Sequence, residues 1–171
     1  MDKEKSLPKR KPTRLKNFDY NHVGAYFITI CTEDRQQILS RIVGVDVLGD
    51  PKNVELLPCG VIADKYINQL NDFYDNLTVD SYIIMPNHIH LLLSVHNDGS
   101  PRTSTPTKQT STISHFVSTF KRFYSKEHGG NIWQRGFYDH VIRGQEDYEE
   151  IAKYICENPM RWYYDELYTE E

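Results

Sequence analysis

The chain has 171 residues, close to the size of one domain, and its 39% hydrophobic and 12% aromatic content is enough to bury a core. No apolar run approaches the roughly 20 residues that a membrane-spanning helix needs, so we expect no membrane partner. The net charge of −4 argues at first against a nucleic-acid partner, although the charges are unevenly distributed along the chain.

The N-terminal part of the sequence predicts a tail followed by a strand. Residues 1–17 are rich in Lys and Pro, and we expect a flexible basic tail there, followed by a single domain over residues 18–165. "GAYFITICT", residues 24–32, is a β-branched and aromatic run typical of a strand. Residues 41–60 alternate apolar residues around Gly-Asp-Pro, which fits a short hairpin or an extended connection.

The middle of the chain predicts a helix and then strands. Apolar residues at spacings of three and four within residues 58–76 indicate an amphipathic helix. Residues 79–84 and 88–95 form one or two strands interrupted at Pro86, which cannot pair within a central ladder. Residues 97–112 are rich in Ser, Thr and Pro, so we expect a flexible loop.

The C-terminal part mixes both kinds of element. Residues 113–124 carry one apolar helical stripe, residues 137–143 are strand-like, and residues 146–158 predict a closing helix that Pro159 ends. Because strands and helices alternate irregularly, the pattern favours an α+β fold with a largely antiparallel sheet.

The charges form separate basic and acidic regions. Cations gather in the first 17 residues and between residues 102 and 126, whereas acids crowd the C-terminal end. Such a distribution can bind a polyanion locally, although solvated charge explains each cation about as well. The candidates for phosphate contacts are Arg14, Lys16, Arg35, Lys121, Arg122 and Arg143.

Two histidines stand in the apolar run "SYIIMPNHIHLLLSV". Because strand side chains alternate between faces, His88 and His90 point the same way. A cation that takes both neutral rings would remove the repulsion between protonated imidazoles, whereas two packed histidines are the simpler reading of a bare His-x-His. A metal site needs a further ligand, and the closing helix offers Tyr154 and Asn158, four residues apart along one edge of its buried face.

"MPNHIHLLL" resembles the histidine motif of the HUH nucleases, in the form found in REP-associated tyrosine transposases and related single-tyrosine transposases. "RLKNFDYNHVGAYFITICT" is similar to the family's opening strand region, and "IWQRGFYDHVIRGQEDYEEIAKYICENP" is similar to its closing block. The resemblance covers residues 14–160.

The resemblance implies a ferredoxin-like antiparallel sheet with helices packed on it. It implies His88 and His90 as ligands of a divalent metal, Mg²⁺ or Mn²⁺, with Asn158 completing the shell. It implies Tyr154 as the nucleophile that forms a 5′-phosphotyrosine on single-stranded or hairpin DNA. Tyr138 is the rival nucleophile, because its strand could reach the same sheet face.

Other functions stay open at the level of sequence. A replication initiator or relaxase would use the same chemistry, and a non-catalytic nucleic-acid-binding module would use the same fold. A metallohydrolase with a metal-bound water would need no tyrosine. The three cysteines show no CxxC pair and the N-terminus lacks an apolar signal segment, so we expect a cytoplasmic protein. We further expect it to be of bacterial type and associated with the nucleoid. A homodimer is one arrangement that we expect.

Overall fold

The computed structural model describes residues 22–44, 53–96 and 111–169. The expected tail over residues 1–17, with Arg14 and Lys16, lies outside the described residues, as does residue range 97–110 of the expected loop. Helix α2 (Thr112–His128) begins at the end of that loop, where the Ser111 side chain accepts a hydrogen bond from Ser114 N at 3.1 Å. A capping serine of this kind begins a helix, so the final residues of the predicted loop belong to α2.

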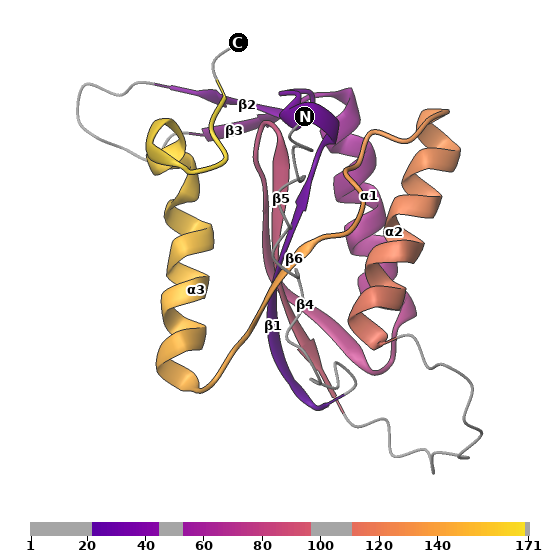
Figure 1. The fold of residues 1–171 in the computed structure, drawn as a ribbon, viewed down its shortest axis with the longest axis vertical. Helices are drawn as coiled ribbons and strands as arrows, with labels where there is room; N and C mark the ends of the chain where they lie inside the picture. Colours follow the sequence, from indigo (N-terminus) through magenta and orange to yellow (C-terminus); the bar gives the residue numbers. More distant parts are fainter. Residues whose placement is uncertain (1–21, 45–52, 97–110, 170–171) are drawn as a thin grey trace, which may run out of the picture.

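A four-stranded antiparallel sheet forms the centre of the molecule (Figure 1). Its strands lie in the order β4 (Leu77–Ile84), β5 (His88–Val95), β1 (Gly24–Cys31) and β6 (Tyr138–Val141). Helix α1 (Pro58–Phe73) connects β1 to β4, and α2 connects β5 to β6. The sequence pattern predicts this α+β fold with an antiparallel sheet, and the family resemblance implies its ferredoxin-like form; both are confirmed.

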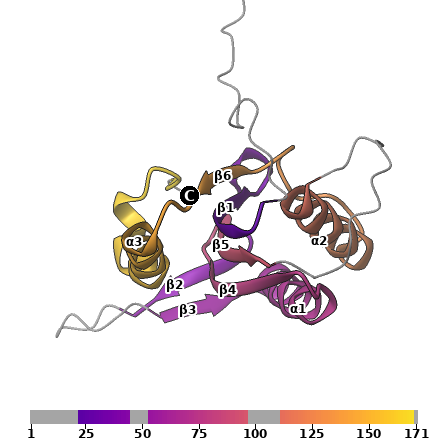
Figure 2. The ribbon, with the colours of Figure 1, turned by 90° about the horizontal axis from the view of Figure 1, so that it is seen from below.

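The helices lie on opposite faces of the sheet. Figure 2 shows α1 and α2 on one face and α3 (Gln145–Glu157) on the other. A smaller hairpin of β2 (Ser40–Val43) and β3 (Asn53–Leu56) is inserted between β1 and α1. The hairpin alternative for residues 41–60 is therefore confirmed.

The main core fills the space between the sheet and the pair α1–α2. Strand β5 sends Ile89, Leu91 and Leu93 into this core, and all three are fully buried. Because strand side chains alternate, the same strand must send its histidines to the face that α3 covers. The core thus fixes the register that decides where His88 and His90 point.

Short 3₁₀ turns complete the described chain. Glu33–Arg35 follows β1, and Asn158–Tyr164 continues directly from α3. The α-helical part of α3 ends at Glu157, just before Pro159, as the sequence predicts. Within the described residues, none of the helices is long and apolar enough to cross a membrane.

Candidate active site

Two rows of side chains cross the sheet on the face toward α3. His90 of β5 pairs with Thr29 of β1, and Thr29 pairs with Tyr138 of β6, so the three side chains share one face. A neighbouring row contains Phe27 and His140, which are paired in the same way. The row with His90 belongs to the candidate site, and in the other row His140 contacts α3.

The two histidines meet in a dry environment. His88 and His90 are 0% and 2% exposed, and their Nε2 atoms lie 3.0 Å apart. Burial lowers the pKa of His88 to about 3, and it lowers the pKa of His90 well below its usual value, with the neighbouring His88 adding to the effect. Both rings are therefore neutral at neutral pH, the state in which imidazole binds metals.

Hydrogen bonds at the outer nitrogens orient both rings. Asn87 Nδ2 donates to Leu167 O at 2.8 Å, which turns Asn87 Oδ1 toward His88 Nδ1 at 2.8 Å. Since that oxygen only accepts, His88 carries its proton on Nδ1, and its Nε2 lone pair points at His90. His90 Nδ1 lies 2.9 Å from Thr29 Oγ1. Such bonds to the outer nitrogen are typical of metal-binding histidines.

Tyr154 reaches the histidine pair from α3. Its hydroxyl lies 3.4 Å from His90 Nε2 and donates to Asp165 Oδ2 at 3.2 Å. Burial, together with the negative charge of Asp165, raises the pKa of Tyr154 to about 12. The phenol is therefore protonated at rest and has a carboxylate beside it that can accept its proton.

Asp165 joins the histidines in a cluster that can hold a metal ion. One ligand atom from each of His88, His90 and Asp165 lies within 4.8 Å of the other two. Asn158 Nδ2 donates to Asp165 Oδ2 at 3.1 Å, which leaves Asn158 Oδ1 buried and without a hydrogen-bond partner among the described residues. A buried acceptor without a donor is costly unless a cation or water satisfies it.

These donors fit a divalent cation. Two neutral imidazole nitrogens, one carboxylate and one amide oxygen are ligands that Mn²⁺ and Mg²⁺ accept in mixed sites. His88, His90, Asp165 and Asn158 are thus the residues that would hold the metal. The set contains the three ligands expected from the sequence and adds a carboxylate.

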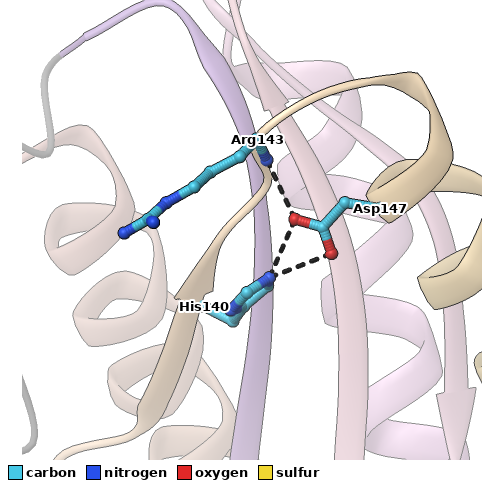
Figure 3. A network of polar contacts seen from close by, with 3 residues as sticks. All are labelled: His140, Arg143 and Asp147. Atoms are coloured by element: carbon cyan, nitrogen blue, oxygen red, sulfur yellow. Dashed lines mark hydrogen bonds and ion pairs between the residues drawn. The ribbon is translucent and has the colours of Figure 1, made fainter.

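A second contact attaches α3 to the sheet, shown in Figure 3. His140 Nε2 on β6 lies 3.0 Å from both carboxylate oxygens of Asp147, and Arg143 N donates to the same carboxylate at 2.9 Å. Asp147 and Tyr154 are seven residues apart, so they lie on nearly the same face of α3. The contact fixes the start of the helix two turns before Tyr154.

A cavity of about 640 Å³ opens beside Tyr154. Its deeper wall includes Phe27, Thr29 and His90, and the rings of Phe27 and His90 lie 4.9 Å apart between centroids. Its outer wall includes residues from β6 and from the segment after α3. A volume of this size accommodates a small organic group or a few substrate atoms beside the nucleophile.

The cations predicted from the sequence do not gather at one place. Arg35 lines the cavity, and its Nη1 donates to Glu166 O at 3.1 Å. Lys121 Nζ donates to Gln134 O at 2.8 Å and also to Gly136 O, so it holds the α2–β6 connection. Arg122 lies in a groove between α1 and α2 on the other face of the sheet. Arg143 is exposed, and its side chain points away from the His140–Asp147 contact (Figure 3).

Asp165 is the site residue that sequence reasoning missed. It stands among the C-terminal acids, which resemble a solvated charged end. The turn Asn158–Tyr164 folds the chain back over the site, and Trp162 in that turn is 3% exposed. A tryptophan beyond the helix-ending proline is the one indication in the sequence that the chain continues to pack there.

The fold and the site define a class of protein: a ferredoxin-like sheet with paired histidines on one of its two inner strands and a tyrosine on the helix that covers them. The family model described as "Transposase IS200 like" matches residues 61–158, more than half of the chain. The chain therefore belongs to the IS200-like transposase family, and the resemblance inferred from the sequence is confirmed.

The chain is also similar to two curated proteins and to a solved structure. An uncharacterised Haemophilus influenzae protein is 29% identical over 94% of this chain and 94% of its own length. A second protein of that organism, named "Putative REP-associated tyrosine transposase", is 27% identical over 87% of this chain and 77% of its own. The solved structure of a REP-associated tyrosine transposase bound to a REP hairpin has a TM-score of 0.58 at 19% identity. It covers 86% of this chain and 74% of that one.

Proposed function

We propose that this protein is a metal-dependent single-tyrosine DNA transposase that cleaves and rejoins single-stranded or hairpin DNA. The observation that carries the proposal is the position of the Tyr154 hydroxyl, 3.4 Å from His90 Nε2 and beside the carboxylate of Asp165. A nucleophile and a proton acceptor thus lie together at a cluster of metal-ligand side chains.

The reaction begins with attack of the Tyr154 oxygen on a phosphorus atom of the DNA backbone. The bond between this oxygen and phosphorus forms, and the bond from phosphorus to the 3′ oxygen breaks. Asp165 Oδ2 accepts the phenol proton and passes it to the solvent, and water supplies one proton to the departing 3′ oxygen, which becomes a hydroxyl, so the number of protons is unchanged. The products are a 5′-phosphotyrosine and a free 3′-hydroxyl.

The site suits a reversible exchange of esters. One phosphodiester is replaced by another of similar energy, so a 3′-hydroxyl can attack the phosphotyrosine and restore the DNA strand. Burial of both histidines keeps their rings neutral and oriented throughout. A Mg²⁺ or Mn²⁺ ion, when bound, supplies Lewis-acid stabilisation of the charge on the phosphate oxygens.

DNA as the partner is supported by the relatives. The solved structure with a TM-score of 0.58 contains a REP hairpin bound to its transposase. Arg35 lines the cavity next to Tyr154 and can contact a phosphate that flanks the cleaved one. We extend this partner class to the present chain, with single-stranded or hairpin DNA as substrate.

A second candidate is a non-catalytic nucleic-acid-binding module with the same fold. The contact of the Tyr154 hydroxyl with Asp165 Oδ2 at 3.2 Å fits this candidate as well, because the same hydrogen bond holds a phenol that never reacts. The two candidates differ in whether a covalent bond to DNA ever forms.

The test is to incubate the protein with an end-labelled DNA hairpin that carries single-stranded flanks, in Mn²⁺ or Mg²⁺, and then to run a denaturing gel. With the label at the 3′ end, which stays on the fragment joined to the protein, we expect a labelled band at the mass of the protein plus this fragment. EDTA added before the DNA should prevent the band from forming. Tyr154→Phe should lose the band but keep DNA binding in gel shifts, because only a hydroxyl is lost. A non-catalytic module would shift the DNA and give no such band under any condition.

A further inference from the structure

The outer wall of the cavity carries two aromatic side chains that the proposed chemistry does not use. Tyr138 and Tyr164 both line the cavity and are 52% and 90% exposed. Two exposed aromatic rings that border the same cavity form a surface of the kind found at ligand-binding grooves. Neither ring is needed to bury the core, which lies on the other side of the sheet.

Tyr138 stands on the edge strand of the sheet, in the same row as the histidine site. The row runs from His90 on β5 through Thr29 on β1 to Tyr138 on β6. No strand of the described residues lies beyond β6, so the ring of Tyr138 forms the outer border of the site. Tyr138, the rival nucleophile, therefore lies at the border of the site, whereas Tyr154 contacts His90 directly.

Tyr164 borders the same cavity from the segment that follows α3. It is the last residue of the turn Asn158–Tyr164 and directly precedes Asp165. Both ends of this turn are attached to the site, because Asn158 Nδ2 donates to Asp165 Oδ2. The backbone that carries Tyr164 is therefore fixed beside the metal-ligand cluster.

The cavity also contains a cation suited to phosphate. Arg35 lines it and is joined to the C-terminal segment through Glu166 O. Exposed aromatic rings next to a guanidinium are the combination with which proteins bind unpaired nucleotides, by stacking on the base and pairing with the phosphate. Two acids also line the cavity, Asp165 and Glu166. Asp165 belongs to the cluster with His88 and His90, where a bound cation would offset its charge.

We propose that Tyr138 and Tyr164 stack on unpaired bases that flank the phosphate held at Tyr154, and that Arg35 contacts a neighbouring phosphate. This inference rests on the proposed function and adds to it the side chains that would hold the unpaired bases on either side of the reacting phosphate. Because every base has a flat face, such stacking is tolerant of sequence.

The test uses the full chain in EDTA and a fluorescein-labelled dodecamer of deoxythymidine, with a dodecamer of abasic sites as the second probe. Tyr138→Ala and Tyr164→Ala should each raise the Kd for the thymidine probe by roughly 5- to 150-fold, the range seen for a lost stacking contact. Neither should change the Kd for the abasic probe more than about twofold. Tyr138→Phe keeps the ring and should bind like the unsubstituted chain.

Tyr163→Ala is the matched control, because Tyr163 is 58% exposed in the same turn and lines a different cavity. A Kd equal to that of the unsubstituted chain in either Tyr138→Ala or Tyr164→Ala would overturn the proposal for that ring, equal values in both would overturn it whole, and so would no measurable binding of the thymidine probe. Should Tyr138→Ala melt at a lower temperature, Tyr138→Leu replaces it, keeping apolar bulk without a flat ring.

The binding experiment tests the stacking role, and adduct formation tests the transposase chemistry, so each can fail without the other. Loss of thymidine binding in the alanine variants, together with no covalent adduct in Mn²⁺, would support the stacking role and refute the transposase chemistry. An adduct on Tyr154 with unchanged binding in both alanine variants would refute the stacking role alone.

Discussion

At the scale of single residues, Asp165 joins several parts of the site, although no sequence motif points to it. Its Oδ2 accepts hydrogen bonds from the Tyr154 hydroxyl and from Asn158 Nδ2, and its Oδ1 accepts one from Leu167 N at 2.7 Å. The carboxylate therefore connects the nucleophile, the expected amide ligand and the C-terminal segment. A change at this one residue should affect metal binding and proton acceptance together.

Asp165→Ala should weaken Mn²⁺ binding, because the cluster loses its only carboxylate. Loss of even an outer partner of a metal ligand costs 10–100-fold in affinity, so we expect at least about 10-fold here by calorimetric titration. Glu166→Gln is the control, since Glu166 lines the same cavity outside the cluster. Equal Mn²⁺ affinity in Asp165→Ala and the unsubstituted chain would remove Asp165 from the ligand set.

Lys121 gives a prediction for the pH dependence of stability. Burial lowers its pKa from the usual 10.5 to about 8. The folded state then binds fewer protons than the unfolded state between pH 8 and 10.5, so this residue makes stability rise with pH across that window. The free energy of unfolding of the unsubstituted chain, minus that of Lys121→Met, should increase by up to about 3 kcal/mol there.

Urea titrations of both proteins at pH 7.5, 9 and 10.5 measure this difference, and the subtraction removes the contribution of the tyrosines. A difference that stays flat with pH would contradict the lowered pKa of Lys121, because its ammonium would then be as stable in the folded as in the unfolded chain.

Local periodicity explains which site residues could be predicted. His88 and His90 follow from alternation along a strand, and Tyr154 and Asn158 follow from four-residue spacing on a helix. Asp165 could not be found in this way, because it comes to the site through a turn whose direction no short pattern encodes. Tyr138 could be placed on the sheet face but not at its edge, which depends on the order of the strands.

At the scale of elements, Gly60 decides how α1 packs against the inserted hairpin. It lies in the first turn of α1, and a Cβ there would overlap the carbonyl oxygen of Leu39. The same carbonyl accepts a hydrogen bond from Leu57 N at 2.9 Å, so it cannot easily move away. Only glycine allows the helix to approach this closely.

Gly60→Ala should therefore destabilise the protein by about 1–3 kcal/mol through overpacking. Helix propensity alone predicts the opposite sign, since alanine is favoured over glycine within helices. Gly130→Ala serves as the control because a Cβ there meets nothing within 4 Å. Thermal unfolding of the two variants measures the difference, and a Gly60→Ala variant as stable as the unsubstituted chain would contradict the packing.

The elements themselves were largely predictable, and their ends were not. Residues 113–124 carry the apolar stripe that predicts α2, yet the helix extends to His128 because Gly129, in a left-handed conformation, caps it there. The closing helix ends where Pro159 requires, but a proline also suits the first turn of the 3₁₀ segment that follows. The turn after α3 depends on the burial of Trp162, and no local sequence pattern shows that burial.

At the scale of the whole molecule, the two faces of the sheet carry different groups. Figure 2 shows α3 on one face of the sheet and α1 and α2 on the other. The α3 face bears the site and Arg35, whereas Arg122 lines a groove formed by α1 and α2. The net charge of −4 gives no general attraction to DNA, so binding must come from local cations. The salt dependence of binding can therefore locate the DNA.

Arg35→Ala should reduce the slope of log K against log salt by about one, because one phosphate contact is lost. Arg122→Ala should leave the slope unchanged if DNA occupies only the α3 face. Fluorescence anisotropy with a labelled hairpin between 50 and 200 mM salt, roughly the range over which such slopes are measured, gives both values. A reduced slope in Arg122→Ala alone would place the DNA on the α1–α2 face.

The central claim is that Tyr154 becomes covalently bound to DNA, and mass spectrometry of the adduct tests it most directly. Trypsin releases Tyr154 in the peptide YICENPMR and Tyr138 in the peptide GFYDHVIR, so each peptide contains a single tyrosine. After Mn²⁺-dependent reaction with a hairpin and nuclease digestion, we predict a nucleotide attached to YICENPMR. Attachment to GFYDHVIR, or to any other tyrosine, would contradict the assignment of α3 as the catalytic helix.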